Sequence, residues 1–191
     1  MDRFARIVIG YHGCKARFAN DLLVGRKPIA TWRQSQNAYD WLGSGIYFWE
    51  HSPTRALHWA EEQFRGRASV VGAVIQLGYC FDLLNEEFPP LLGKSFQKID
   101  SSYRSSGKQL PQNHGREKKL RALDCAVIND CISNLESLGR EFDTVRGAFL
   151  EGEPAFAGTT ISTETHIQIA VRNIDCILGI FRPNLTESHD Q

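Results

Sequence analysis

Residues 41–60, WLGSGIYFWEHSPTRALHWA, combine a glycine turn, an aromatic run and a helix start. The glycines on either side of Ser44 permit a sharp backbone that bulkier residues would resist. Residues 46–49 predict a short buried strand, because aromatic and β-branched side chains favour strands. Ser52 followed by proline predicts a helix start with a hydroxyl N-cap. Together they make one wall of a pocket on which Tyr47 presents a flat ring, unless these aromatic residues only fill the core.

A second strand is predicted near the start of the chain. The β-branched run of residues 7–10 ends at glycine and leads into Tyr11-His12-Gly13. A histidine beside a glycine can reach a ligand while the adjacent backbone approaches it closely. The alternative is that His12 is a structural residue with its hydrogen bonds satisfied inside the protein.

A late segment, residues 165–171 (THIQIAV), alternates polar and apolar residues and predicts a strand. Its apolar positions, Ile167, Ile169 and Val171, would face the core. His166 and Gln168 would face the other side, together with Glu164 if the strand extends that far. Such a polar row belongs to a solvent-facing surface or, beside a cleft, to a functional site.

The rest of the chain reads as one domain over residues 1–183, followed by a flexible tail over residues 184–191. No internal repeat or long linker interrupts it. An insertion-like segment covers residues 95–138, and its most polar part, 95–112, is predicted to be mobile. The other expected helices are at 18–23 and 116–138, with a helical turn from 81 to 84, and the other expected strands are at 70–76, 148–150 and 177–181. Loops are expected at 31–39, over the pocket, and at 151–160.

Composition limits the possible functions. The 191 residues include 22 basic and 22 acidic side chains, so no bulk charge drives binding to nucleic acid or an anionic membrane. No apolar run is long enough for a membrane helix, and Met1-Asp2-Arg3 does not open a signal peptide. The five cysteines form no CxxC pair, which predicts reduced thiols, a cytoplasmic setting and no metal site.

Taken together, Tyr11-His12-Gly13, the GSGIYF run at residues 43–48 and the strand at 165–171 resemble the motifs of the ADP-ribosyltransferase superfamily of the diphtheria-toxin and poly-ADP-ribose-polymerase type. The chain also resembles a small bacterial group with similar YHG, GSGIYF and THIQIAV blocks. The resemblance implies an α+β fold in which two packed antiparallel β-sheets surround an NAD cleft, with flanking helices.

The resemblance also implies roles for individual residues. The Gly13 backbone would bind the nicotinamide carboxamide, His12 an adenosine-ribose hydroxyl, and Tyr47 the face of the nicotinamide ring. Ser44 and Gly45 would lie at the turn beside the ligand. The following helix would supply two more contacts. Ala56 is the candidate for a small residue that lets the ligand approach, and either His58 or Trp59 is the candidate for a second ring partner.

The chain departs from this pattern at the third motif, where Gln168 replaces the usual glutamate. A carboxylate there would stabilise the cation that develops at the sugar, whereas an amide supplies no charge. Glu151, Glu153 and Glu164 lie upstream as candidate replacements, each with the alternative of being a solvated loop acid. Arg146 is a candidate for a diphosphate or acceptor contact, with an ion pair to Asp143 or another acid as the alternative, and the weaker candidates of this kind are Arg33 and Lys15.

The resemblance therefore implies transfer of a single ADP-ribose from NAD, as substrate, to a macromolecular acceptor, as in a bacterial toxin or defence enzyme that a neutralising antitoxin would restrain. One alternative is a module that binds NAD or ADP-ribose with little catalysis, which Gln168 favours. Another is the NAD-dependent RNA 2′-phosphotransferase branch of the fold, and the last is a partner-binding role for exposed tryptophans. Nothing in the sequence selects protein, RNA or DNA as the acceptor.

Overall fold

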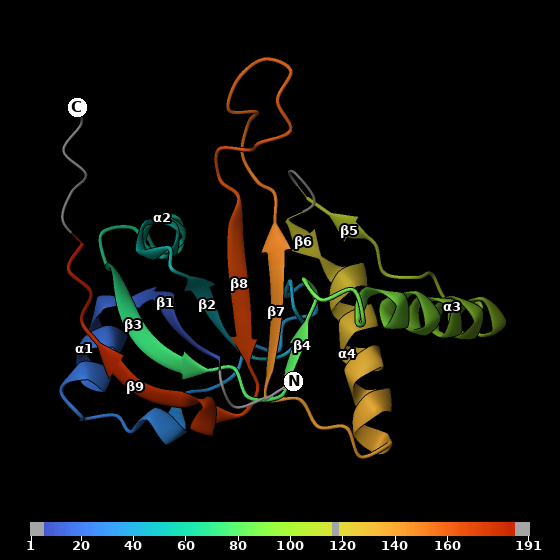
Figure 1. Cartoon of the computed structure of the whole chain (residues 1–191), viewed down its shortest axis with the longest axis horizontal. Coiled ribbons are helices and arrows are strands. Elements are labelled where there is room, and N and C mark those ends of the chain that lie inside the picture. The colour runs from blue at the N-terminus through green and yellow to red at the C-terminus, as the bar shows by residue number, and fades with distance from the viewer. Residues whose placement is uncertain (1–5, 116–118, 186–191) are drawn as a thin grey trace.

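The computed structural model describes residues 6–115 and 119–185 (Figure 1). The chain is an α+β protein. Its strands are β1 (Ile7–Lys15), β2 (Ile46–Glu50), β3 (Ala68–Gln76), β4 (Cys80–Asp82), β5 (Asn113–His114), β6 (Leu120–Arg121), β7 (Thr144–Phe149), β8 (His166–Val171) and β9 (Ile177–Phe181). Its helices are α1 (Ala16–Leu23), α2 (Pro53–Phe64), α3 (Pro89–Ser105) and α4 (Ala122–Ser137), with 3-10 turns η1 (Ile29–Thr31) and η3 (Ile174–Cys176).

The main sheet has seven strands in the order β4-β7-β8-β2-β1-β3-β9, and β5 and β6 form a small separate sheet. This arrangement corrects the expectation of two packed antiparallel sheets. Strand β2 pairs with β1 on one edge and with β8 on the other, so it joins both halves into one sheet. The sheet is also mixed, because β4 and β7 run parallel.

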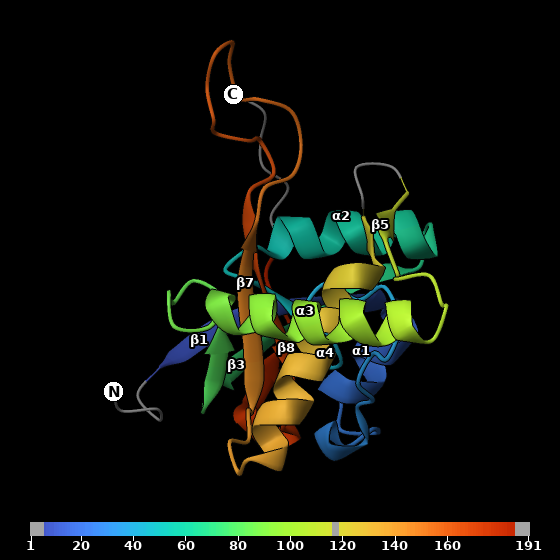
Figure 2. The ribbon, with the colours of Figure 1, turned by 90° about the vertical axis from the view of Figure 1, so that its right-hand side faces the viewer.

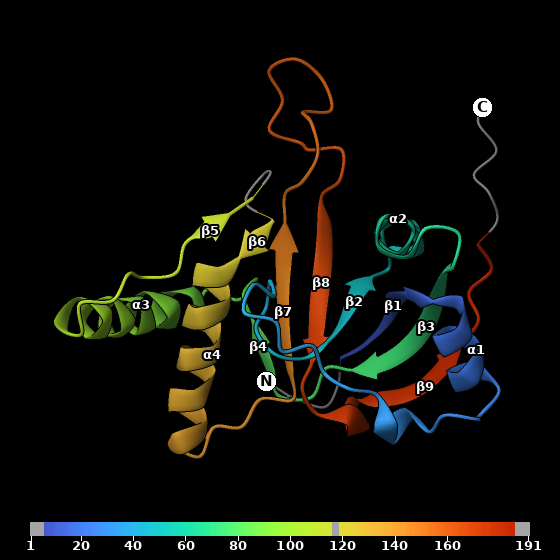
Figure 3. The same cartoon turned by 180° about the vertical axis from the view of Figure 1, so that it is seen from behind.

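The two halves of this sheet diverge where β1 meets β2. Among the described residues these strands share only the Cα pairs Gly10–Glu50 and Tyr11–Trp49, whereas β1 pairs with β3 along its whole length. Figures 1 and 3 show β3 and β9 with α1 on one side, and β4 and β7 with α3 and α4 on the other. The chain between β7 and β8 projects beyond the sheet (Figure 2). The divergence of β1 and β2 opens the space described below.

Strand β2 serves two hydrophobic cores because its side chains alternate between faces. Phe48 is fully buried in the core that β1, β3 and β8 share with α1. Tyr47, on the opposite face, packs against the core that contains Phe81, Ile132 and Val145. Burial on both faces explains why the segment is apolar and aromatic throughout rather than alternating.

Several elements predicted from the sequence are confirmed. Strands at β1, β2, β3, β8 and β9 and helices at α1 and α2 lie where expected. The helix predicted over residues 116–138 begins only at Ala122, as α4, because Leu120 and Arg121 pair with β5 as strand β6. The strand predicted at 148–150 is the end of β7, and the predicted loop over residues 31–39 leads from η1 toward β2. All five cysteines are buried and free. No helix within the described ranges is long and apolar enough to cross a membrane.

Other elements differ from the predictions. Residues 81–84 do not begin a helix, because Cys80–Asp82 pairs with β7 as strand β4. Most of the segment predicted to be mobile is helix α3, which begins at Pro89-Pro90 and packs against α4. Proline lacks only a donor that the first helical turn leaves free, so it begins this helix rather than preventing it. The Ser52 hydroxyl makes no capping bond to α2.

Two expectations extend beyond the described residues. Residues 116–118 of the helix predicted from 116 and residues 186–191 of the predicted tail lie outside the described residues. Leu185, at the described edge of that tail, packs against the cluster around Trp49.

Candidate functional site

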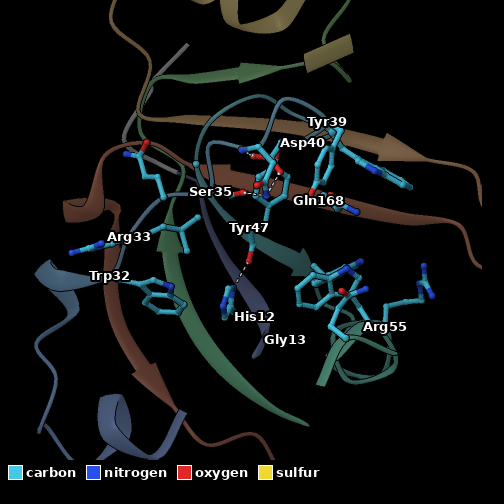
Figure 4. Close-up of a pocket in the computed structure, with 18 of the residues that line it drawn as sticks. His12, Gly13, Trp32, Arg33, Ser35, Tyr39, Asp40, Tyr47, Arg55 and Gln168 are labelled. Carbon is cyan, nitrogen blue, oxygen red and sulfur yellow. Dashed lines mark hydrogen bonds between the residues drawn. The ribbon is translucent and has the colours of Figure 1, made fainter. Parts of the chain in front are cut away.

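A cavity of about 1010 Å³ lies between β1, β2, α2, β8 and the chain over residues 31–41 (Figure 4). His12, Tyr47 and Gln168 all line it, although they come from three separate strands. Gly13 and Gly45 also contribute to its wall. The structure thus brings the three sequence motifs to one hollow.

Gly13 allows helix α2 to lie directly on β1. A Cβ atom at this position would overlap the carbonyl oxygen of Ala56, so a side chain would force the helix away. Ala56 is itself fully buried, which makes it a packing residue beneath the cavity wall rather than part of the wall. Close packing of α2 on β1 therefore fixes the floor of the cavity beside His12.

His12 is held in one tautomer by the neighbouring strand. Its Nδ1 lies 2.8 Å from the carbonyl oxygen of Tyr47, so Nδ1 carries the proton and donates. Burial lowers the His12 pKa to about 4, and this bond opposes part of the shift. The ring packs edge-on against Trp32 at 4.8 Å between centroids. His12 is therefore neutral near pH 7, with the lone pair of Nε2 available to accept a hydrogen bond.

Two hydrogen bonds hold the Tyr47 hydroxyl in place. The hydroxyl donates to the Gly43 carbonyl oxygen at 2.6 Å and accepts the Leu42 N–H at 2.8 Å. Burial raises the pKa of this phenol. Gly43 has a φ of 73°, which favours glycine, so the turn and the tyrosine form one closed unit. The Tyr47 ring is thereby locked in position at the cavity wall.

Ser44 takes part in this turn but not in the cavity. Its backbone N–H donates to the side-chain oxygen of Asn129 at 3.1 Å. Among the described lining residues the glycine turn is represented by Gly45, whose Cβ would press on Ala170 of β8. The predicted role of Ser44 as a turn residue fits this placement better than a ligand contact.

Gln168 is buried and bonded to a second histidine. Its Nε2 lies 3.0 Å from Nε2 of His166, two residues earlier on the same face of β8. The Nδ1 of His166 lies 2.8 Å from the Glu164 carbonyl oxygen and 3.6 Å from a carboxylate oxygen of Glu151. Burial lowers the pKa of His166. A row of polar groups thus connects the cavity wall with the loop that follows β7.

The three candidate acids take different positions. The Glu151 carboxylate lines the cavity, is only 7% exposed, and forms ion pairs with Arg55 at 2.7 Å and Lys119 at 3.3 Å. Glu164 also pairs with Arg55, at 3.2 Å, but its side chain is 42% exposed. Glu153 is exposed and is not among the described lining residues. Glu151 is therefore the candidate acid that reaches the cavity.

Arg146 lies in an ion-pair cluster instead of the cavity wall. Its guanidinium donates two hydrogen bonds to Glu50, at 2.6 and 2.9 Å, and contacts Asp82 at 3.3 Å. It is absent from the described lining, so the geometry favours the ion-pair alternative, with partners other than Asp143. Of the weaker cationic candidates, Arg33 lines the cavity, whereas Lys15 lies over the Phe64 ring.

Helix α2 places Trp59, not His58, at the cavity. Trp59 lines the wall, packs beside Trp49 at 5.7 Å between ring centroids, and keeps 37% of its surface exposed. His58 is exposed and lies outside the described lining. Consecutive helical residues point about 100° apart, so only one of the two can face the cavity.

The predicted loop over residues 31–39, which contains Trp32, lies at this wall, whereas Arg55 and Trp41 were not among the predicted site residues. Arg55 precedes Trp59 by four residues on α2, and such pairs share a helix face. That spacing was the available signal for Arg55. Trp41 lies in irregular chain, where no periodicity indicates which way a side chain points.

Comparison of the chain with protein-family models, with curated proteins and with solved structures found no match.

Proposed function

We propose that this protein transfers ADP-ribose from NAD to a macromolecular acceptor. The observation that supports this most is the convergence of His12, Tyr47 and Gln168 on one cavity. Ligand pockets commonly measure about 300–1,000 Å³, so this cavity lies at the upper end and suits an extended dinucleotide. The resemblance of the three motifs to those of ADP-ribosyltransferases gives the chemistry that such a cavity would perform.

In this reaction the bond between the ribose C1′ and the nicotinamide nitrogen breaks, and its electron pair leaves with nicotinamide. Positive charge develops at the ribose. A nucleophilic oxygen or nitrogen of the acceptor then bonds to C1′ and loses its proton. The overall change converts NAD and acceptor into nicotinamide, ADP-ribosylated acceptor and one proton.

The residues at the cavity suit parts of this task. The Nε2 lone pair of His12 can accept a hydrogen bond from a ribose hydroxyl, because the ring proton is on Nδ1, which donates to the Tyr47 carbonyl oxygen. The locked ring of Tyr47 offers a flat face for nicotinamide, and Trp59 offers a second aromatic surface. The buried carboxylate of Glu151 is a source of negative charge near the developing cation.

A specific observation favours a second candidate function, a module that binds NAD without efficient cleavage. Gln168 is neutral, and the charge of Glu151 is already opposed by Arg55 and Lys119. Both features weaken the electrostatic stabilisation of a cation in the cavity. Binding and cleavage must therefore be measured separately.

The test uses purified protein, NAD labelled in its adenylate part, and a cell lysate. Label on a macromolecule together with released nicotinamide supports transfer. Nicotinamide release without labelling indicates hydrolysis, and binding without release indicates the second candidate. Absence of NAD binding by calorimetry would overturn both.

A matched pair of variants locates the binding site. Trp59→Ala removes an aromatic surface worth about 1–3 kcal/mol per stacked base, so we expect the NAD dissociation constant to rise about 5- to 150-fold. His58→Ala changes the neighbouring residue, which faces away from the cavity, and should leave the constant unchanged. Equal effects of the two variants would contradict the assigned site.

A further inference from the structure

We infer that His166 is a positioning residue that turns the Gln168 amide so that its carbonyl oxygen, rather than its NH₂ group, is offered to a ribose hydroxyl in the cavity. The identity of the hydroxyl rests on the proposed function. The orientation of the amide rests only on contacts within the protein. It follows from three hydrogen-bonding steps along β8.

The first step fixes the proton on His166. Its Nδ1 faces the Glu164 carbonyl oxygen at 2.8 Å and a Glu151 carboxylate oxygen at 3.6 Å. Both are acceptors, so Nδ1 must carry the proton. The side chain of His166 is fully buried, and this burial opposes a second proton. His166 is thus a neutral imidazole whose Nε2 has a lone pair.

The second step fixes the amide of Gln168. Its terminal group lies 3.0 Å from the His166 Nε2. A lone pair can accept a hydrogen bond only from the NH₂ group, whereas the amide oxygen at the same place would face a second lone pair. The carbonyl oxygen therefore points away from His166. Within residues 6–115 and 119–185 no hydrogen-bond partner for it is found, and Gln168 lines the cavity.

The third step explains why an amide occupies this position. Glutamate at 168 would bring a carboxylate against the lone pair of His166 and would require the imidazole to take a second proton. That cation would face the guanidinium groups of Arg55 and Arg121, which oppose it, and the carboxylate of Glu151, which favours it. Gln168 avoids this buried charge and still presents an acceptor oxygen, so His166 and Gln168 act as a matched pair.

The principal test measures the tautomer and titration of His166 by NMR of protein labelled with ¹⁵N at histidine. The His166 signals are assigned by their loss in His166→Gln. In the wild type we expect the tautomer with the proton on Nδ1, and a titration midpoint below that of free histidine. In Gln168→Glu we expect the midpoint to rise by at least one pH unit.

Gln168→Leu is the control, because it removes the hydrogen bond and keeps a similar volume without adding charge. Its His166 midpoint should not rise. A wild-type proton on Nε2 would show that the amide oxygen faces His166 and would overturn the inference. An unchanged midpoint in Gln168→Glu would overturn it as well.

Kinetics test the consequence for the proposed reaction. His166→Gln can still offer an oxygen acceptor to the Gln168 amide, whereas His166→Leu cannot. We expect kcat/KM for NAD to fall at least tenfold in His166→Leu and to recover partly in His166→Gln, with unfolding midpoints measured for both. Equal loss in the two variants would contradict positioning. If the wild type does not bind NAD, the proposed function fails, while the NMR result still decides the orientation of the amide.

Discussion

Arg146 and Arg55 each lie between two carboxylates, yet they occupy different surroundings. Arg146 bridges Glu50 and Asp82, whose side chains are 9% and 5% exposed. Arg55 bridges Glu151 and Glu164 at the wall of the cavity. The same charge pattern therefore holds strands together around Arg146 and lines the cavity around Arg55. The contact with a cavity, rather than the ion pair itself, distinguishes a candidate site residue.

The largest effect should come from Arg146→Leu. Loss of the guanidinium leaves Glu50 without its bidentate partner, while Asp82 keeps Arg6 at 2.8 Å. Breaking a buried ion pair costs about 3–5 kcal/mol, and we expect that reduction in the free energy of unfolding measured with urea. Arg17→Leu, at a 95% exposed position paired with Asp21, should change it by less than about 0.5 kcal/mol. A loss below about 1 kcal/mol in Arg146→Leu would refute the structural role.

The pH dependence of stability should reveal the contribution of His12 on the cavity side. The pKa of His12 lies at about 4 in the folded chain and near 6.5 in the unfolded chain, so the unfolded state binds more protons between these values. Stability should therefore fall as the pH drops from 6.5 to 4, by up to about 3 kcal/mol from this group.

His12→Asn keeps a donor for the Tyr47 carbonyl oxygen but does not titrate in this range. Urea unfolding at several pH values should show a shallower loss in this variant than in the wild type, while Arg17→Leu, at a 95% exposed position, should keep the wild-type slope. Identical slopes in the wild type and His12→Asn would show that His12 is not held neutral by burial.

Arg55→Leu should reduce stability less than Arg146→Leu does. Glu151 retains Lys119, and Glu164 is partly solvated, so we expect a loss of about 2 kcal/mol. NAD binding or cleavage should change more strongly in this variant than in Arg146→Leu when both are assayed well below their unfolding midpoints. The reverse order of functional effects would remove the distinction between the two arginines.

The smallest stability effect should come from Glu164, in the loop between β7 and β8. Glu164→Gln weakens a partly exposed pair and should cost less than about 1 kcal/mol. Glu151→Gln removes the carboxylate that reaches the cavity and should lower the rate of nicotinamide release at least tenfold. Glu153→Gln is the matched control, because its side chain is exposed and lies outside the described lining. Equal rates in the three variants would exclude Glu151 as the source of charge.

The sequence predicted most strands because their signals are local. The runs at residues 7–10 and 165–171 show β-branched or alternating patterns that a strand requires, and the structure contains β1 and β8 there. Strand β4 was missed because three residues carry too little periodicity, and its pairing with β7 is decided by tertiary contact. Helix α3 was missed because its serine-rich surface resembles a loop and only Ser95 and Ile99 are buried.

The candidate site was predictable where a residue type has a distinctive neighbour. His12 beside glycine, and Tyr47 after the glycine turn, were identified in this way and line one cavity. Arg146 was ambiguous because an arginine on a strand gives no indication of which acids lie opposite it. His166 connects Gln168 with Glu151 only because the fold brings them together, so the spacing of these residues along the sequence could not predict the contact.

The two hydrogen bonds made by the Tyr47 hydroxyl have a consequence for proton transfer. Its hydrogen is committed to Gly43 and a lone pair to Leu42, and the raised pKa keeps the phenol protonated. Tyr47 is therefore unsuited to act as a general base, and deprotonating the acceptor before attack is not its task. On the proposed function, the proton of the acceptor atom must therefore go to another group, such as the Glu151 carboxylate at the cavity, or to water.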